Sequence, residues 1–293
     1  MNKTNEKILN RLACPNCKTR VSLNEQGTLW HCSSCQRKFL IKQEVPIMLT
    51  EEVQKEIDLA AKSKDGKQMI SEFNREELFC KAYDVGKKIV SSDLNISDAL
   101  KIKKLDLLKK EMILEVGAGN RRLAEKVVNM DIVLFENTDV VGDAHNLPFV
   151  DDSFDVVWIE MVLEHVRDPQ RVVGEIRRVL KPGGYVYSMT PFIMPFHGYP
   201  GDYQRYTLSG LDELFKLFSK ESSGVYKGPS VALVNYVSDY FTLFSFSGNR
   251  LIFALIKAFF LCLLFPVKYL DRILVKNSAS HKLSNALFYL GRK

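Results

Sequence analysis

Two cysteine pairs near the start of the sequence have the spacing of a metal site. Each pair has the form C-x-x-C, and fourteen residues separate Cys14 and Cys17 from Cys32 and Cys35. Each pair can form a tight knuckle, and a hairpin between the pairs can bring their thiolates to one ion. Four thiolates complete a tetrahedral zinc site and leave no position for water. The spacing therefore predicts a structural Zn2+ ion, with a redox dithiol as the alternative interpretation.

A glycine turn and two acidic residues indicate a second site. An apolar run leads into Gly117-Ala118-Gly119, and a turn of this kind lets the backbone come close to a ligand. Asp131 ends the next apolar run, where a carboxylate can hydrogen-bond both ribose hydroxyls of a nucleoside. Asp143 follows the third run, where it can accept from an adenine amino group. The pattern predicts a nucleoside-containing ligand.

Candidate bases follow the fourth and fifth apolar runs. His165 stands beside Glu164 after the fourth run, while His197 and Asp202 lie in a long aromatic, proline-broken loop at 191–206. A base at such a place can remove the proton of an acceptor hydroxyl. The alternatives are that His165 braces the next helix and that the loop is a packed lid without a chemical role.

Strands alternating with helices must position these residues. Apolar runs at 127–132, 138–144, 154–160 and 184–190 have the texture of buried strands, and the segment 169–184 ends in Lys-Pro-Gly-Gly as a stopped helix does. This alternation predicts an α/β fold, a Rossmann-like and mostly parallel sheet with helices on both faces. The predicted divisions are a zinc ribbon at 1–50, a helical connector at 51–110, a core at 111–228 and apolar, basic C-terminal helices at 229–293.

The segments LEVGAG, GDAHNLPF, SFDVVW, VLEHV and RVLKPGG occur in an order that resembles the class I, type 11-like, S-adenosylmethionine-dependent methyltransferase family. The resemblance covers residues 112 to about 220. It implies methyl transfer, S-adenosyl-L-methionine as donor, and His165, His197 and Asp202 as candidate catalytic residues. The cofactor contacts that it implies are Glu115, Gly117, Ala118, Gly119, Asp131, Asp143, Ala144 and Glu160.

One departure from the family concerns the glycine loop. Many members continue as G-x-G-x-G, whereas Arg121 stands at the third glycine position and the gap to Asp131 is short. We therefore expect an abbreviated first helix, with Arg121 close to the methionine end of the cofactor. A non-catalytic zinc-ribbon scaffold with a degenerate cofactor loop is the alternative.

Two further resemblances concern the partners. Residues 9–49 resemble the small zinc-ribbon proteins that bind and activate methyltransferases. The loop from Pro191 to Tyr206, followed by SGLDELF, resembles a bacterial subgroup of methyltransferases linked to surface-glycan and envelope biosynthesis. The second resemblance rests on His197, Asp202, Tyr203, Arg205 and Tyr206. It implies a hydroxyl of a glycan or lipid-linked envelope precursor as acceptor.

The C-terminal segment suggests contact with a membrane. The formal net charge is +6, and from residue 250 onwards eight basic residues accompany one acid. Residues 251–265 are almost wholly apolar but short for a span, and Pro266 is expected to end the helix. We predict peripheral attachment through residues 250–293; a buried cap, a dimer contact and a true span are the alternatives.

The remaining expectations concern location and the rival function. The start lacks the apolar stretch of a secretory signal, so we expect a cytoplasmic protein, peripheral on the inner face of the cell membrane. The rival is an RNA methyltransferase whose ribbon is a substrate module and whose basic tail holds phosphates. The apolar character of the tail favours lipid over nucleic acid. The oligomeric state is left open.

Overall fold

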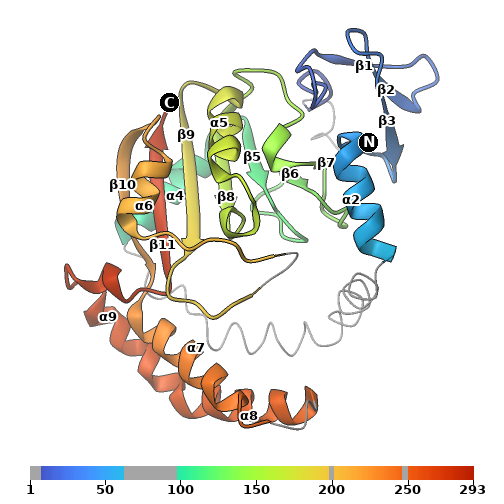
Figure 1. Ribbon diagram of the computed structural model, residues 1–293. Helices are drawn as coiled ribbons and strands as arrows, with labels where there is room; N and C mark the ends of the chain where they lie inside the picture. Colours follow the sequence, from blue (N-terminus) through green and yellow to red (C-terminus); the bar gives the residue numbers. More distant parts are fainter. Residues whose placement is uncertain (1–7, 63–97, 198–200, 246–249) are drawn as a thin grey trace.

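The computed structural model describes residues 8–62, 98–197, 201–245 and 250–293 (Figure 1). Its centre is a Rossmann-like sheet, as predicted. Five strands run parallel in the order β7-β6-β5-β8-β9. Next to β9 lies β11, which is antiparallel to it, and the edge strand β10 is antiparallel to β11 and so runs in the direction of the five. These strands are β5 (Ile113–Val116), β6 (Val127–Asp131), β7 (Val140–Gly142), β8 (Phe154–Glu160), β9 (Leu180–Pro191), β10 (Ser219–Lys227) and β11 (Ala286–Arg292).

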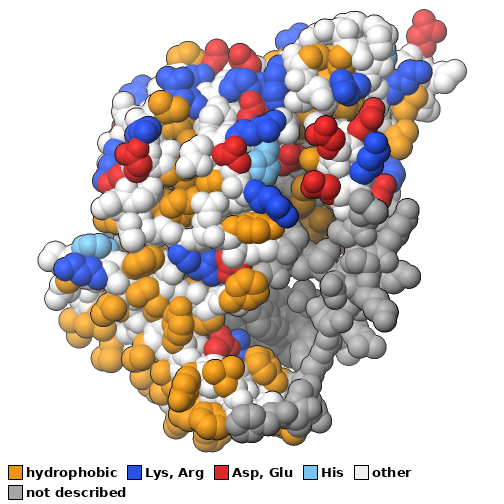
Figure 2. All heavy atoms as spheres, viewed as in Figure 1, with side chains coloured by type: hydrophobic (Ala, Val, Ile, Leu, Met, Phe, Trp, Pro, Cys, Tyr) orange, Lys and Arg blue, Asp and Glu red, His pale blue; other side chains and the backbone are white. Residues whose placement is uncertain are grey.

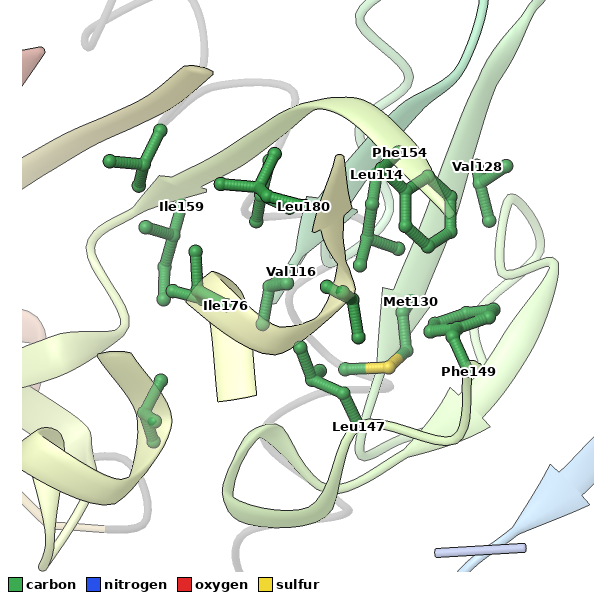
Figure 3. Close-up of a cluster of buried hydrophobic side chains, with 14 of the residues drawn as sticks. Leu114, Val116, Val128, Met130, Leu147, Phe149, Phe154, Ile159, Ile176 and Leu180 are labelled. Atoms are coloured by element: carbon green, nitrogen blue, oxygen red, sulfur yellow. The ribbon is translucent and has the colours of Figure 1, made fainter. Parts of the chain in front are cut away.

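Helices cover both faces of this sheet. Successive strand residues point to opposite faces, so Leu114 and Ile113 of β5 belong to two separate apolar clusters. The first cluster receives α5 (Pro169–Val179) and α6 (Leu208–Leu214), and Figure 3 shows its core side chains. The second cluster receives α4 (Asp98–Leu108). The predicted three-layer arrangement is confirmed.

The N-terminal ribbon is an extension of the same sheet. Its strands are β1 (Val21–Leu23), β2 (Leu29–Cys32), β3 (Lys38–Lys42) and β4 (Val45–Met48), joined antiparallel in that order. The last strand, β4, pairs in parallel with β7 at the edge of the main sheet. Of the predicted helical connector, the structure describes α2 (Glu51–Lys62) and α4, while residues 63–97 lie outside the described residues.

The C-terminal region differs from the predicted run of helices at 229–293. Residues 286–292 form β11, which lies between β9 and β10 and is buried along most of its length. Its residues are apolar on both faces because both faces of the sheet are covered, and such a run cannot be distinguished from a helix by periodicity. Because Lys227 of β10 pairs with Ala286 of β11, the helices between them are an insertion into a β-hairpin.

The inserted segment contains α7 (Pro229–Thr242), α8 (Arg250–Leu264), η4 (Phe265–Leu270), α9 (Asp271–Leu274) and η5 (Ser280–Lys282). The α-helix α8 ends just before Pro266, but the chain continues through η4 and α9, so the predicted stop at this proline is wrong for the helical segment as a whole. A proline in the first turn of the following helical segment is tolerated because its missing N–H is not needed there.

Asp271 joins the end of the long helical segment to the start of α7. Its side chain is fully buried, and it accepts hydrogen bonds from the amides of Ser230, at 2.8 Å, and Val231, at 3.3 Å. These amides belong to the first turn of α7, where a carboxylate satisfies free N–H groups. A Cβ on Gly228 would lie 2.3 Å from the Asp271 carboxyl carbon, so glycine is required at this approach.

Candidate functional site

The four ribbon cysteines converge as the sequence predicts. Sulfur–sulfur distances are 3.5 Å for Cys14 and Cys35 and 3.4 Å for Cys17 and Cys32, and all four sulfurs lie within 4.8 Å of one another. A tetrahedral site with Zn–S bonds of about 2.3 Å places its sulfurs about 3.8 Å apart. The donor set and its spacing therefore fit Zn2+.

Two matching turns produce this arrangement. The amide of Lys18 donates to the Cys14 carbonyl and that of Gln36 donates to the Cys32 carbonyl, each at 2.9 Å. Lys18 and Gln36 each have a φ of 60°, the left-handed conformation that closes a tight knuckle. A hydrogen bond from Thr19 lowers the pKa of Cys17 to about 6, which favours the thiolate that binds metal.

The ribbon is docked on the core. The Ala13 amide donates to the Pro148 carbonyl and the Val150 amide to the Arg11 carbonyl, each at 2.9 Å. Lys18 forms an ion pair of 2.7 Å with Glu175 of α5. A metal ion held by the four cysteines would therefore stabilise a segment that is continuous with the central sheet.

The predicted cofactor residues gather at the carboxyl edge of the parallel strands. Gly117 has a φ of +70°, and a Cβ there would lie 2.2 Å from a methyl carbon of Val162. Gly119 has a φ of +58° and faces open space. Asp131 accepts from the Gly119 amide at 2.8 Å and from the Val133 amide at 3.0 Å, and burial raises the pKa of Asp131. This acid therefore fixes the glycine loop from the neighbouring strand.

The sequence predicts an abbreviated first helix, but the structure has a short loop in its place. Residues 120–126 contain no helix. Arg122 donates to both carboxylate oxygens of Asp139, at 3.1 and 3.0 Å, and the Asn129 side chain donates to the Arg121 carbonyl at 2.7 Å. These bonds hold the loop against β6 and the segment that precedes β7.

Arg121 lies between two buried carboxylates. Its guanidinium donates to Oε1 of Glu115 and, at 2.7 Å, to Oε2 of Glu160. Lys104 completes the group with an ion pair of 3.0 Å to Glu160. Burial raises the pKa of Glu115, whereas for Glu160 the charges of Lys104 and Arg121 outweigh burial and lower the pKa. The second oxygen of Glu115, Oε2, is buried and has no hydrogen-bond partner among the described residues.

Asp143 and Ala144 begin the 3-10 turn η2 (Ala144–Asn146). Oδ1 of Asp143 accepts from the backbone and from Nδ1 of His145, at 3.0 and 2.8 Å, and Oδ2 accepts from Asn146 at 3.3 Å. Burial opposes ionisation of Asp143, but the bonds from His145 outweigh it and lower the pKa. The carboxylate therefore has local partners, and its contact with adenine stays a prediction.

The candidate catalytic residues meet at the end of β8. Glu164 and His165 lie in the turn η3 (Leu163–His165), and Glu164 is fully buried. His197, from the loop after β9, places its Nε2 3.4 Å from the Glu164 carboxylate, and the rings of His165 and His197 meet edge to face at 5.0 Å. Asp202 accepts from the His197 amide at 3.1 Å and pairs with Arg205, which lowers the pKa of Asp202.

Two features of this region gave no signal in the sequence. Lys104 lies 4.8 to 4.9 Å from the ring centres of Trp158, Tyr187 and Tyr226, in addition to its pair with Glu160. It is one of several lysines in α4, and only its position against the sheet distinguishes it. The burial of Glu164, in a turn flanked by a histidine, was likewise not evident from its neighbours.

Comparisons with known proteins agree with this geometry. Residues 107–188 match a family model described as a methyltransferase domain. A demethylmenaquinone methyltransferase of Clavibacter sepedonicus is 39% identical over 117 residues, covering 39% of this chain and 42% of that protein. One of Bacillus velezensis is 35% identical over 106 residues, covering 27% of this chain and 46% of that protein. The chain therefore spans less than half the length of these relatives.

Among solved structures, phosphoethanolamine N-methyltransferase 2 of Haemonchus contortus, in complex with S-adenosyl-L-methionine, has a TM-score of 0.37 and 17% identity. The match covers 66% of this chain and 52% of the chain of that enzyme. The glycine loop, the acid of β6 and the segments through β9 all fall within or beside the matched residues. Residues 107–188 of this chain are therefore similar to the methyltransferase domain family.

Proposed function

We propose that this protein transfers a methyl group from S-adenosyl-L-methionine to a hydroxyl of a glycan or lipid-linked envelope precursor at a membrane surface. The observation that supports cofactor binding best is the buried, unpartnered Oε2 of Glu115 beside the open space at Gly119. A buried acceptor without a partner is costly, and a ligand ammonium would satisfy it.

The residues of this edge fit the parts of the cofactor. Glu115 would bind the methionine ammonium, Arg121 the methionine carboxylate, and Asp131 the ribose hydroxyls. Asp143 and Ala144 would face the adenine. The bound cofactor supplies a methyl group on a positively charged sulfur, which needs little covalent assistance.

The residues after β8 and β9 would serve the acceptor. The bound cofactor would supply its methyl group to the acceptor oxygen, with the electron pair of the broken carbon–sulfur bond left on sulfur. The hydroxyl proton passes to the cluster of Glu164, His165 and His197. Asp202 holds His197 through its backbone amide. Placement of the acceptor in line with the methyl group is the main contribution of the protein.

Replacement of Asp131 by alanine tests the donor site. We expect S-adenosyl-L-methionine to bind about 1.5–3 kcal/mol more weakly, because hydrogen bonds to a charged group are lost. Calorimetric titration measures this change. Glu136→Ala is the matched control, since Glu136 is exposed and its loss changes the net charge equally. Unchanged affinity in Asp131→Ala would place the ribose contact elsewhere, and a wild-type protein that binds no cofactor would support the scaffold alternative.

The acceptor depends on regions outside the family match. That match ends at residue 188, before the loop that carries His197 and before the inserted helices. The two relatives are named for demethylmenaquinone, a small acceptor and not an RNA. The insertion therefore offers the better guide to the acceptor of this chain.

The inserted helices expose a large apolar surface. Six of its side chains are 56% to 70% exposed, and Figure 2 shows the hydrophobic groups gathered over α7, α8 and α9. We call these residues the apolar hairpin surface: Leu243, Phe244, Leu255, Phe259, Leu263 and Ile273. On the other side of α8, Phe260 stacks on Phe241 of α7 at 3.9 Å. Contiguous exposed apolar surface of this kind indicates contact with a membrane or a partner.

We propose that the apolar hairpin surface contacts membrane lipid. Arg272, Lys276 and Lys282 are exposed in the same insertion, and cationic, apolar helices bind anionic interfaces. By length and composition, the helical segment Ile252–Leu274 could cross a membrane, and few of its residues are buried. However, the buried Asp271 attaches the end of this segment to α7, which favours a helix lying in the interface.

Excision of the insertion tests membrane binding. Residues 229–283 are replaced by Asn-Gly, because Lys227 and Ala286 are paired and a short turn can join them. This variant keeps β11, so we expect it to fold. Wild-type protein should sediment with anionic vesicles and be only partly released by 1 M salt, where the Debye length is about 3 Å. The excised protein should stay in solution.

Single substitutions refine the vesicle experiment. Phe259→Ser should weaken partitioning by about 1.5–3 kcal/mol, the value of burying one such side chain. Leu40→Ser, which removes a side chain 56% exposed on the ribbon, is the control and should have no effect. Binding that salt abolishes would favour a basic patch for lipid or RNA phosphates, and absence of binding would favour a protein partner.

A further inference from the structure

Three side chains in the region assigned to the acceptor have metal-ligating atoms that lie close together. Oε1 of Glu164 lies 3.4 Å from Nε2 of His197 and 3.8 Å from Nε2 of His165. The ligand atoms of all three residues lie within 4.8 Å of one another. In a four-coordinate site with bonds of about 2.0–2.2 Å, neighbouring ligand atoms are about 3.3–3.6 Å apart. The cluster is therefore close to the spacing of a metal centre.

These atoms lack partners within the protein. Glu164 is 0% exposed, and neither of its carboxylate oxygens makes a hydrogen bond to any described residue. Nε2 of His197 is buried and also makes none. A buried carboxylate without hydrogen bonds is strongly unfavourable unless a cation compensates its charge. A cation between the three groups would satisfy all of them.

The outer sides of the two imidazoles are held in a way that suits metal ligands. Nδ1 of His165 lies 2.5 Å from the Gly201 carbonyl, which fixes the proton on Nδ1 and leaves a lone pair on Nε2. Nδ1 of His197 faces the pair of Asp202 and Arg205, at 3.6 Å and 3.4 Å. In the structure Arg205 donates to Nδ1 of His197, so an ion bound at Nε2 would move the proton to Nδ1 and turn this nitrogen from Arg205 toward Asp202, the arrangement typical of metal-binding histidines.

We infer that Glu164, His165 and His197 bind one divalent transition-metal ion, separate from the ion of the ribbon. Two imidazoles and a carboxylate suit Zn2+ and its neighbours in the first transition row better than Mg2+ or Ca2+. Three protein ligands leave at least one position open, as in catalytic zinc sites and unlike the closed four-cysteine site.

The open position gives the ion a use. The cluster lies between the turn after β8 and the loop after β9, the regions assigned above to the acceptor. An acceptor hydroxyl bound to the ion would lose its proton at a lower pH, and within the cluster the proton would pass to Oε2 of Glu164, since the ion would occupy Oε1 and both Nε2 atoms. This role in activating the acceptor rests on the proposed methyl transfer. The binding of the ion is inferred independently of that proposal.

Cobalt titration of the full-length protein tests the inference. Metal is removed with a chelator and Co2+ is added in steps, with total metal measured by elemental analysis. We expect two equivalents per chain: one with sulfur-to-cobalt charge-transfer absorption from the ribbon, and one without it. Glu164→Gln and His197→Ala should each lose the second equivalent and keep the first. Asp202→Asn should bind it about 10–100-fold more weakly, as is usual when the partner of a metal-bound histidine is changed.

The matched control is His281→Ala, which removes a histidine of the C-terminal insertion and should keep both equivalents. Retention of the charge-transfer band shows that a variant is folded. One equivalent in the wild type, or two in Glu164→Gln, overturns the inference. Because no cofactor or acceptor is present, failure of S-adenosyl-L-methionine binding would count against the proposed function and not against the metal.

Discussion

Replacement of Cys17 by serine should release the thiolate-bound zinc and unfold the ribbon. Structural zinc sites bind their ion with an apparent free energy of roughly 10–16 kcal/mol at neutral pH, and much of the stability of a small ribbon comes from it. Cys17 is exposed, whereas Cys14 and Cys32 are buried, so serine at position 17 removes a ligand without leaving a cavity. Elemental analysis should show one zinc fewer per chain, and limited proteolysis should cut the first fifty residues faster.

The loss should be confined to the ribbon at first. The ribbon and main sheet share the pairing of β4 with β7, which involves only Ile47 with Val141 and Met48 with Gly142. Cys262→Ser is the control because Cys262 is exposed on α8, far along the chain from the ribbon, and it should retain all zinc. A freshly purified wild-type protein without thiolate-bound zinc would contradict the assignment of the ribbon.

Replacement of Arg121 by alanine should weaken both the fold and cofactor binding. Glu115 and Glu160 are buried; Glu160 would keep its ion pair with Lys104, whereas Glu115 would lose its ion-pair partner and keep only the more distant charge of Arg122. Breaking a fully buried ion pair costs about 3–5 kcal/mol, and because the Arg121 side chain is 47% exposed we expect about 2–3 kcal/mol at neutral pH. Loss of the contact with the methionine carboxylate should weaken S-adenosyl-L-methionine binding by about 1.5–3 kcal/mol.

The stability deficit of Arg121→Ala should depend on pH. Burial already raises the pKa of Glu115 above its ordinary 4.5, and removal of Arg121 raises it further. A raised carboxyl pKa means that the folded state binds the proton more tightly than the unfolded state. The deficit is therefore largest above the folded pKa of Glu115 and shrinks as the pH falls through it toward 4.5. Thermal unfolding at a series of pH values measures this change.

Two variants separate charge from geometry at this position. Arg121→Lys keeps the charge but loses the planar fork that reaches both carboxylates, so it should be intermediate. Lys126→Ala removes an exposed charge from the same loop and should change neither stability nor affinity. Tighter cofactor binding by Arg121→Ala would mean that Arg121 blocks the site, in agreement with a degenerate, non-catalytic loop.

The predictions from sequence were most successful where local patterns have one physical solution. Two C-x-x-C pairs require a common turn, and both knuckles have it, at Lys18 and Gln36. The glycines at 117 and 119 adopt the positive φ that the turn after a parallel strand requires. The shortening at the first helix followed from the short distance to Asp131, which leaves too few residues for a helix between two strands.

The predictions failed or were silent where distant segments meet. Residues 286–292 looked like a helix because an apolar run does not specify its partners, and only the gap between β9 and β10 makes it a strand. Lys104 gave no signal because its three aromatic neighbours come from three different strands.

By itself, the sequence determined the pairing of the four cysteines, the alternating fold and the acids at the strand ends, because each depends on spacing along the chain. Tertiary structure decided which charges face one another. Arg121 joins Glu115 to Glu160, and the loop after β9 brings His197 to Glu164. These contacts join residues from separate strands and loops, and the energy of a buried charge depends on the partners that folding places around it.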